Sequence, residues 1–128
     1  MRLWFAICTV FLVAGLRAQD LPPEIFDTHP TALDNAHFHR LFQNEFVEVI
    51  RVHLGPHEKT ARVELPAHVM TCLSDQHVRL LYPRGKPKER AQKAGFTGWM
   101  ERDDYGIENL EDKPAEWILV VPLSGDKG

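Results

Sequence analysis

The sequence predicts an all-β domain, built as a small sandwich or barrel of short strands. Eight or nine runs rich in β-branched and apolar residues alternate with turn residues, at spacings of about eight to twelve residues. No stretch keeps the capped 3.6-residue apolar period of a helix, so helices should be few. The 128 residues suffice for one domain and are too few for two separate cores.

Composition narrows the class of protein. The chain is 44% hydrophobic and 26% charged, which is typical of a globular protein and not of a disordered one. Its formal net charge is -3 and it has no basic stripe, which argues against nucleic acid and anionic membranes as partners. Two cysteines are too few for a disulfide-stapled miniprotein.

The N-terminus has the pattern of an export signal. Arg2 precedes an uncharged apolar run of 12 residues, 3–14, and Ala18 supplies a small residue before a cleavage point. As a helix this run would cover about 18 Å, short of the roughly 30 Å hydrocarbon core of a membrane. Residues 1–18 are therefore predicted to be a signal peptide, giving a secreted or periplasmic protein with no membrane contact after cleavage. An uncleaved N-terminal anchor is the alternative.

After cleavage, Cys72 remains as the single thiol of the chain. It lies in an apolar run and is predicted to be buried and inert.

The first half of the mature chain begins with an irregular lead-in over residues 19–36, which contains three prolines among polar residues. Strands are expected at 37–43 and at 45–54, and the second is rich in β-branched residues. Two more follow at 60–65 and 68–73, with Pro66 as a bend between them.

The second half continues the series. A strand at 77–82 leads into a Pro- and Gly-containing turn at 83–87. The charged segment 89–93 is typical of an edge strand with outward-facing side chains. Further strands are expected as follows: 96–100, then 107–109 after a polar stretch at 101–106, and a nearly continuous apolar closing strand at 115–123. The β-barrel domain is thus predicted to span residues 37–124.

Several segments resemble the small single-domain cupins, of the RmlC-like type. They are Asn-Glu-Phe-Val-Glu-Val-Ile-Arg-Val at 44–52, Leu-Gly-Pro-His-Glu-Lys-Thr at 54–60, Lys-Ala-Gly at 93–95, and Glu-Asn-Leu-Glu-Asp-Lys-Pro-Ala-Glu at 108–116. The resemblance covers residues 36–123. It implies a double-stranded β-helix, or jelly roll, that is often dimeric.

Cupins commonly hold a divalent metal on two histidines, a glutamate and a further histidine. In this sequence the two histidine positions fall on Val63 and Leu65, and the glutamate position falls on Val69 or Met70. The last histidine position falls on Tyr105 when counted back from Asn109, or on Gly106 when counted forward from Gly95. A first-row divalent ion needs three or four nitrogen or oxygen ligands at about 2.0–2.2 Å, which these side chains do not offer. The resemblance therefore predicts that the metal site is lost, with no metal or other cofactor.

The leading hypothesis is an exported binding or interaction module that takes a small molecule in the barrel. Its predicted ligand-binding residues are Val63, Leu65, His68, Met70 and Tyr105. No catalytic residue is predicted, and whether the protein is an enzyme stays open.

Two alternatives remain. The first is a cupin metalloenzyme, of dioxygenase or isomerase type, with a rearranged site. That site would use His68 with Glu64 and Tyr105, or the strand-spaced pair His37 and His39. The second is a purely structural role in a homodimer formed through edge strands.

Overall fold

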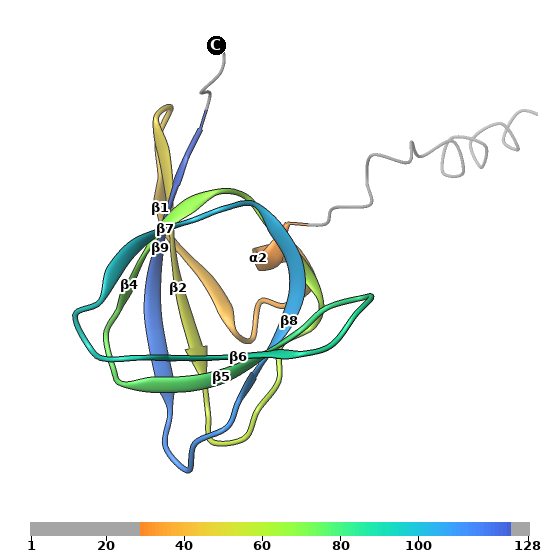
Figure 1. Cartoon of the computed structure of the whole chain (residues 1–128). Coiled ribbons are helices and arrows are strands. Elements are labelled where there is room, and N and C mark those ends of the chain that lie inside the picture. The colour runs from red at the N-terminus through yellow and green to blue at the C-terminus, as the bar shows by residue number, and fades with distance from the viewer. Residues whose placement is uncertain (1–28, 124–128) are drawn as a thin grey trace, which may run out of the picture.

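The computed structural model describes residues 29–123, which form two antiparallel sheets wrapped around one interior (Figure 1). The strand order is β1-β2-β9-β4-β7 in one sheet and β3-β8-β5-β6 in the other. The elements are α2 (Pro30–Leu33), β1 (Phe38–Gln43), β2 (Val47–Leu54), β3 (Val63–Leu65), β4 (His68–Cys72), β5 (Gln76–Leu81), β6 (Lys88–Gln92), β7 (Thr97–Met100), β8 (Asp103–Asn109) and β9 (Ala115–Pro122). The predicted all-β barrel is confirmed.

The signal-peptide prediction for residues 1–18 and most of the lead-in at 19–36 lie outside the described residues. Within the described part of the lead-in, α2 replaces the expected irregular chain. His29 caps this helical turn by accepting a hydrogen bond from Thr31 N at Nδ1, 3.1 Å away, and Pro30 supplies a helical φ at the first position. No helix within residues 29–123 is long and apolar enough to cross a membrane.

Strand alternation builds the core. In β2, Ile50, Val52 and Leu54 face inward and are buried, while the residues between them are half-buried on the outer side. β9 lies between β2 and β4, so both of its edges are hydrogen-bonded, and its Trp117 is 1% exposed. The other buried apolar residues are Phe38, Val63, Leu65, Met70, Cys72, Val78, Leu80, Tyr105, Ile107, Ala115, Leu119 and Val121.

Two predictions about the second half were wrong. The polar stretch 101–106 is not a loop throughout, because β8 begins at Asp103, which lies opposite Leu65 on β3. The backbone of β3 provides hydrogen bonds there that side-chain polarity does not reveal. On β6, Arg90 does not face outward. It lies directly opposite Val78, which is fully buried, and paired residues of neighbouring strands share a face.

Cys72 is buried, as predicted. Gln76 Nε2 lies 3.3 Å from its sulfur. Burial raises the pKa of the Cys72 thiol above its usual value, although the positive charge of Arg90 acts in the opposite direction. The thiol therefore stays protonated at neutral pH and is a poor nucleophile.

Asn109 ties three segments of the chain together from the end of β8. Its side-chain amide is fully buried. Nδ2 donates to Gly55 O at 3.0 Å and to Lys113 O at 2.8 Å, and Oδ1 accepts from Glu111 N at 3.0 Å. One amide thus satisfies backbone groups after β2 and in the β8–β9 connection, where no strand partner is available.

We expect Asn109→Ala to lower the free energy of unfolding by about 1–3 kcal/mol, because buried carbonyls lose their donor. Asn109→Asp should cost more, because it places a carboxylate oxygen against the same carbonyls. Urea denaturation followed by tryptophan fluorescence measures both. An Asn109→Ala protein as stable as the wild type would show that this amide does not hold the segments together.

Candidate functional site

The five predicted ligand-binding residues all face the interior. Their exposed fractions are as follows: Val63 1%, Leu65 2%, His68 1%, Met70 1% and Tyr105 5%. They come from three strands of both sheets, since β3 and β8 belong to one sheet and β4 to the other. Binding by these residues stays a prediction, but their common orientation follows from strand alternation.

The register resolves the choice between Val69 and Met70 for the inherited glutamate position. On β4 the buried residues are His68, Met70 and Cys72, while Val69 lies on the outer side. Met70 is therefore the inward residue. His68 shares its face two residues away and needs no bulge to do so.

A cation lies in the same region. Arg90 Nη2 is 3.7 Å from the sulfur of Met70, and Arg90 Nη1 is 3.9 Å from that of Met100. Arg90 thus extends from β6, an edge strand of one sheet, to β4 and β7 of the other. This inward position could not be predicted from the sequence, because Lys88, Glu89 and Arg90 are all polar and show no alternation between polar and apolar residues.

We use the name inner polar cluster for Arg90 and three polar side chains of the same region: His68, Tyr82 and Tyr105. Tyr82 and Tyr105 meet edge to face, with ring centroids 5.6 Å apart and an interplanar angle of 81°. His68 lies opposite Met100 in the β4–β7 register. The cluster therefore brings together residues of β4, β6 and β8 and the residue that follows β5.

His68 is held in one tautomer. Its Nδ1 lies 2.7 Å from Pro66 O and donates to that carbonyl. Burial lowers the pKa of His68, and the charge of Arg90 adds to this, whereas the bond to Pro66 O acts in the opposite direction. The neutral ring then carries its proton on Nδ1, and Nε2 is left as an acceptor.

The two phenols stay protonated. Burial is the largest cause that raises the pKa of Tyr105, outweighing the attraction of Arg90 for its phenolate. Burial also raises the pKa of Tyr82, as do the charge of Asp103 and the neighbouring Tyr105. Both hydroxyls can therefore donate hydrogen bonds at neutral pH.

A pocket of about 560 Å³ opens beside the cluster. It is lined by Arg62, Tyr82, Pro83, Arg84, Asp103 and Asp104. Tyr82 belongs both to this pocket and to the inner polar cluster. Arg62 lies at the rim, exposed, with Nε 3.1 Å from Asp104 Oδ1.

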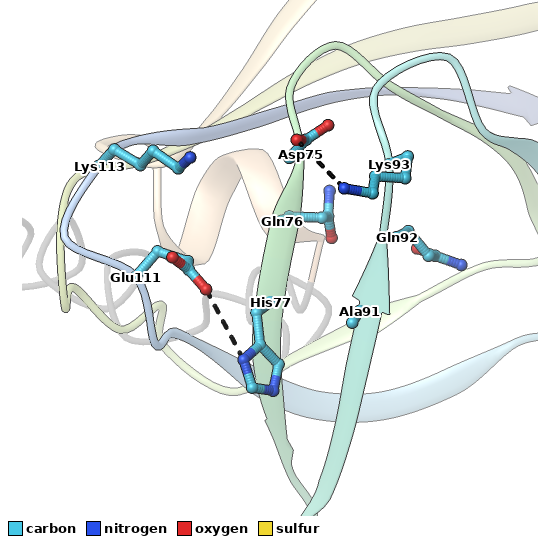
Figure 2. Close-up of a pocket in the computed structure, with 8 residues that line it drawn as sticks. All are labelled: Asp75, Gln76, His77, Ala91, Gln92, Lys93, Glu111 and Lys113. Atoms are coloured by element: carbon cyan, nitrogen blue, oxygen red, sulfur yellow. Dashed lines mark ion pairs between the residues drawn. The ribbon is translucent and has the colours of Figure 1, made fainter.

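A second pocket, of about 380 Å³, lies along β5 and β6 (Figure 2). Its charges are largely paired among themselves. Asp75 lies 3.8 Å from Lys93, and His77 lies 3.7 Å from Glu111, as the dashed lines in Figure 2 mark. Because these charged side chains already pair with one another, this pocket is the weaker candidate for binding a charged ligand.

The residues of the rearranged metal site do not converge. Glu64 faces outward on β3 and pairs with Arg102, so it lies on the opposite face from its neighbours Val63 and Leu65. His37 is held by Asp34 at 2.9 Å and Glu58 at 3.2 Å, and His39 is exposed on β1. Within residues 29–123, no three His, Cys, Asp or Glu side chains gather where they could hold a metal ion.

We expect the burial of His68 to make stability depend on pH. Because its pKa in the folded state lies below 6.5, the ordinary value, only the unfolded chain takes up a proton readily near that pH. Its contribution is present above about pH 6.5 and is lost as pH falls toward the folded-state pKa. The stability advantage of wild type over His68→Gln should therefore shrink between pH 7.5 and 5.5 in urea titrations. The exposed-site variant His39→Gln controls for the loss of one histidine, and an advantage that grew on acidification would contradict the expectation.

Comparison with solved structures identifies the architecture. A cupin domain from Bordetella pertussis Tohama I matches with a TM-score of 0.63 at 16% identity, over 68% of this chain and 92% of its own. A protein with a double-stranded β-helix domain from Klebsiella pneumoniae matches with a TM-score of 0.54 at 18% identity, over 72% and 83% of the two chains. An RmlC-like cupin from Methanocaldococcus jannaschii matches with a TM-score of 0.52 at 14% identity, over 66% and 77%.

No protein-family model and no curated protein sequence matches the chain. The structural likeness, at identities below one in five, carries the fold and not an activity. Together with the two antiparallel sheets around one interior, it confirms the resemblance on which the sequence analysis relied. The described part of this chain has the double-stranded β-helix fold of the cupins.

Proposed function

We propose that this protein is a cupin-fold module that binds a small organic molecule at its inner polar cluster, without a metal ion at the inherited ligand positions. The observation that supports this is the unused hydrogen-bonding capacity of the cluster. Among the described residues, Arg90 Nε is buried without a hydrogen-bond partner, and the hydrogen bond of the buried His68 is made by Nδ1. Polar groups inside a fold are costly unless they are satisfied.

The binding mode follows from the side chains. Val63, Leu65 and Met70 supply an apolar wall, while His68 offers an acceptor and Tyr105 a donor. Such a mixture of apolar walls and a few placed polar groups is typical of small-molecule sites. Nothing in the set supplies an activated nucleophile or a paired acid and base, so we propose binding and not catalysis.

Two methionines beside the cluster, the buried Met70 and the partly buried Met100, allow a direct test. The chain has three methionines, and Met70 and Met100 both contact Arg90. A screen of small neutral, cationic and anionic organic fragments, followed by the methyl resonances of ¹³C-methyl methionine, should find binders that shift Met70 and Met100. Tyr105→Phe should weaken them several-fold by removing one hydrogen bond. Fragments that bind without moving either methyl, or a screen with no binder, would contradict the proposal.

The module is proposed to act outside the cytoplasm, on the strength of the pattern of residues 1–18. Expressed as the full chain in a secreting host, it should be recovered from the exported fraction with Gln19 as its first residue by mass spectrometry. Val10→Arg places a charge in the apolar run and should leave the protein unexported. The conservative Val10→Leu is the matched control and should be exported normally. Recovery of the intact chain from the cytosol would contradict this part of the proposal.

The homodimer hypothesis also stays a prediction, and one feature favours it. The β1–β2 hairpin exposes three large apolar residues: Leu41 is 52% exposed, Phe42 53% and Phe46 66%. β1 is an edge strand of the five-stranded sheet, with free backbone groups along one side. Light scattering at micromolar concentration should then report twice the chain mass, and a monomer would rule this association out.

A further inference from the structure

Arg90 is a cation in the barrel that lacks a counter-charge. No carboxylate of residues 29–123 lies within ion-pair distance of it, and its Nε is buried with no partner. On the outer face, by contrast, Arg51, Arg79 and Arg102 each pair with a glutamate. Arg90 is half-buried, with its Nε out of contact with solvent. A charge partly removed from water is costly unless it is paired, so this unmatched guanidinium calls for an explanation.

The groups around Arg90 do not neutralise it. The thioethers of Met70 and Met100, at 3.7 and 3.9 Å, are weak acceptors. His68, Cys72 and Tyr105 all feel its charge, yet burial keeps each in its neutral form.

Asp103 is the acidic residue of this region and acts on Tyr82 and Tyr105, but it makes no ion pair with Arg90. It lies at the exposed start of β8 and, like Tyr82, lines the pocket of about 560 Å³. The interior end of the cluster is therefore positive, whereas the rim carries two arginines and two aspartates, so its charges balance.

We infer that the ligand of the inner polar cluster is an organic monocarboxylate, with its two oxygens on the guanidinium of Arg90 and its apolar part against Met70 and Met100. This inference rests on the proposed binding function and specifies its ligand class. The planar guanidinium fits a carboxylate with two parallel hydrogen bonds. The Tyr105 hydroxyl is protonated and can donate a further bond to the same group.

A phosphate fits the cluster less well. A phosphate monoester carries nearly two negative charges and three acceptor oxygens. Against these the cluster offers one cation and two phenols, while His68, protonated on Nδ1, presents a lone pair that would repel a phosphate oxygen. With one positive group and few donors, the cluster matches the single negative charge of a monocarboxylate better than the charge of a phosphate.

The test compares matched acids and amides. Acetate, propionate, butyrate and benzoate are each titrated beside their primary amides, which keep the shape and remove the charge. Dissociation constants come from the Met70 and Met100 methyl shifts, and Tm from calorimetry. Wild type should bind at least one acid about tenfold or more tightly than its amide, since a hydrogen bond to a charged group is worth that factor.

Substitutions of Arg90 form the second part of the test. Arg90→Met should abolish the preference for the acid and raise the Tm of the unliganded protein by several degrees, because a thioether of similar reach replaces an unpaired cation between two other thioethers. Arg90→Lys should keep the charge but lose the two-point contact and bind more weakly. Arg79→Met is the matched control. It removes a cation that pairs with Glu108 on the outer face, and it should leave binding unchanged.

A bound acid should also raise the pKa of His68, followed by the histidine ring resonances across a pH titration. Neutralising Arg90 removes one of the causes that lower that pKa. The amides should not have this effect.

The outcomes separate the two proposals. If amides and acids bind equally well and both move the methionine methyls, the binding function stands and the monocarboxylate inference is wrong. If phosphate binds through Arg90 more tightly than every acid, the ligand class is wrong. If neither acids, amides nor phosphate bind, the inference is overturned, and the fragment screen described above then decides separately on the binding function.

Discussion

The architecture depends on one geometric constraint, which is that successive side chains on a strand point to opposite faces of a sheet. Two curved sheets around one interior therefore send every second residue of most strands toward the same space. The residue types at those positions decide what the interior can do. Here they are mostly aliphatic and aromatic. Among the polar exceptions, His68 lies close enough to Arg90 to feel its charge, whereas Gln76 lies beside Cys72 and Asn109 at the end of β8. The core and the candidate site thus both come from the residues that this alternation turns inward.

Much of the fold could be predicted because its signals are local. β-branched runs, prolines and turn residues mark β2, β5 and β9 well enough to place them within a few residues. The first half of β8 could not be placed, since Asp103 and Asp104 are paired only through a strand some forty residues earlier. The five lining residues were accessible through the resemblance to a family pattern. Arg90 was not, because a strand whose residues are nearly all polar does not show which face is buried.

The inner polar cluster illustrates how stability and binding compete in one site. A barrel filled only with apolar side chains would avoid the cost of an unmatched cation and of a buried imidazole. Natural proteins commonly retain such costs where a ligand or a reaction needs them. The thioethers around Arg90 fit this interpretation, because they adapt in shape and make weak contacts without neutralising the charge.

The position of Arg90 on an edge strand has a consequence for motion. β6 is hydrogen-bonded to β5 on one side and has no strand on the other, so it can separate locally without disrupting the five-stranded sheet. Access to the interior and recognition of what enters would then depend on the same short segment. Backbone amides of β2 and β9 should then exchange hydrogen slowly and those of β6 faster. Such a barrel would be rigid in its five-stranded sheet and mobile at the β6 edge of the other sheet.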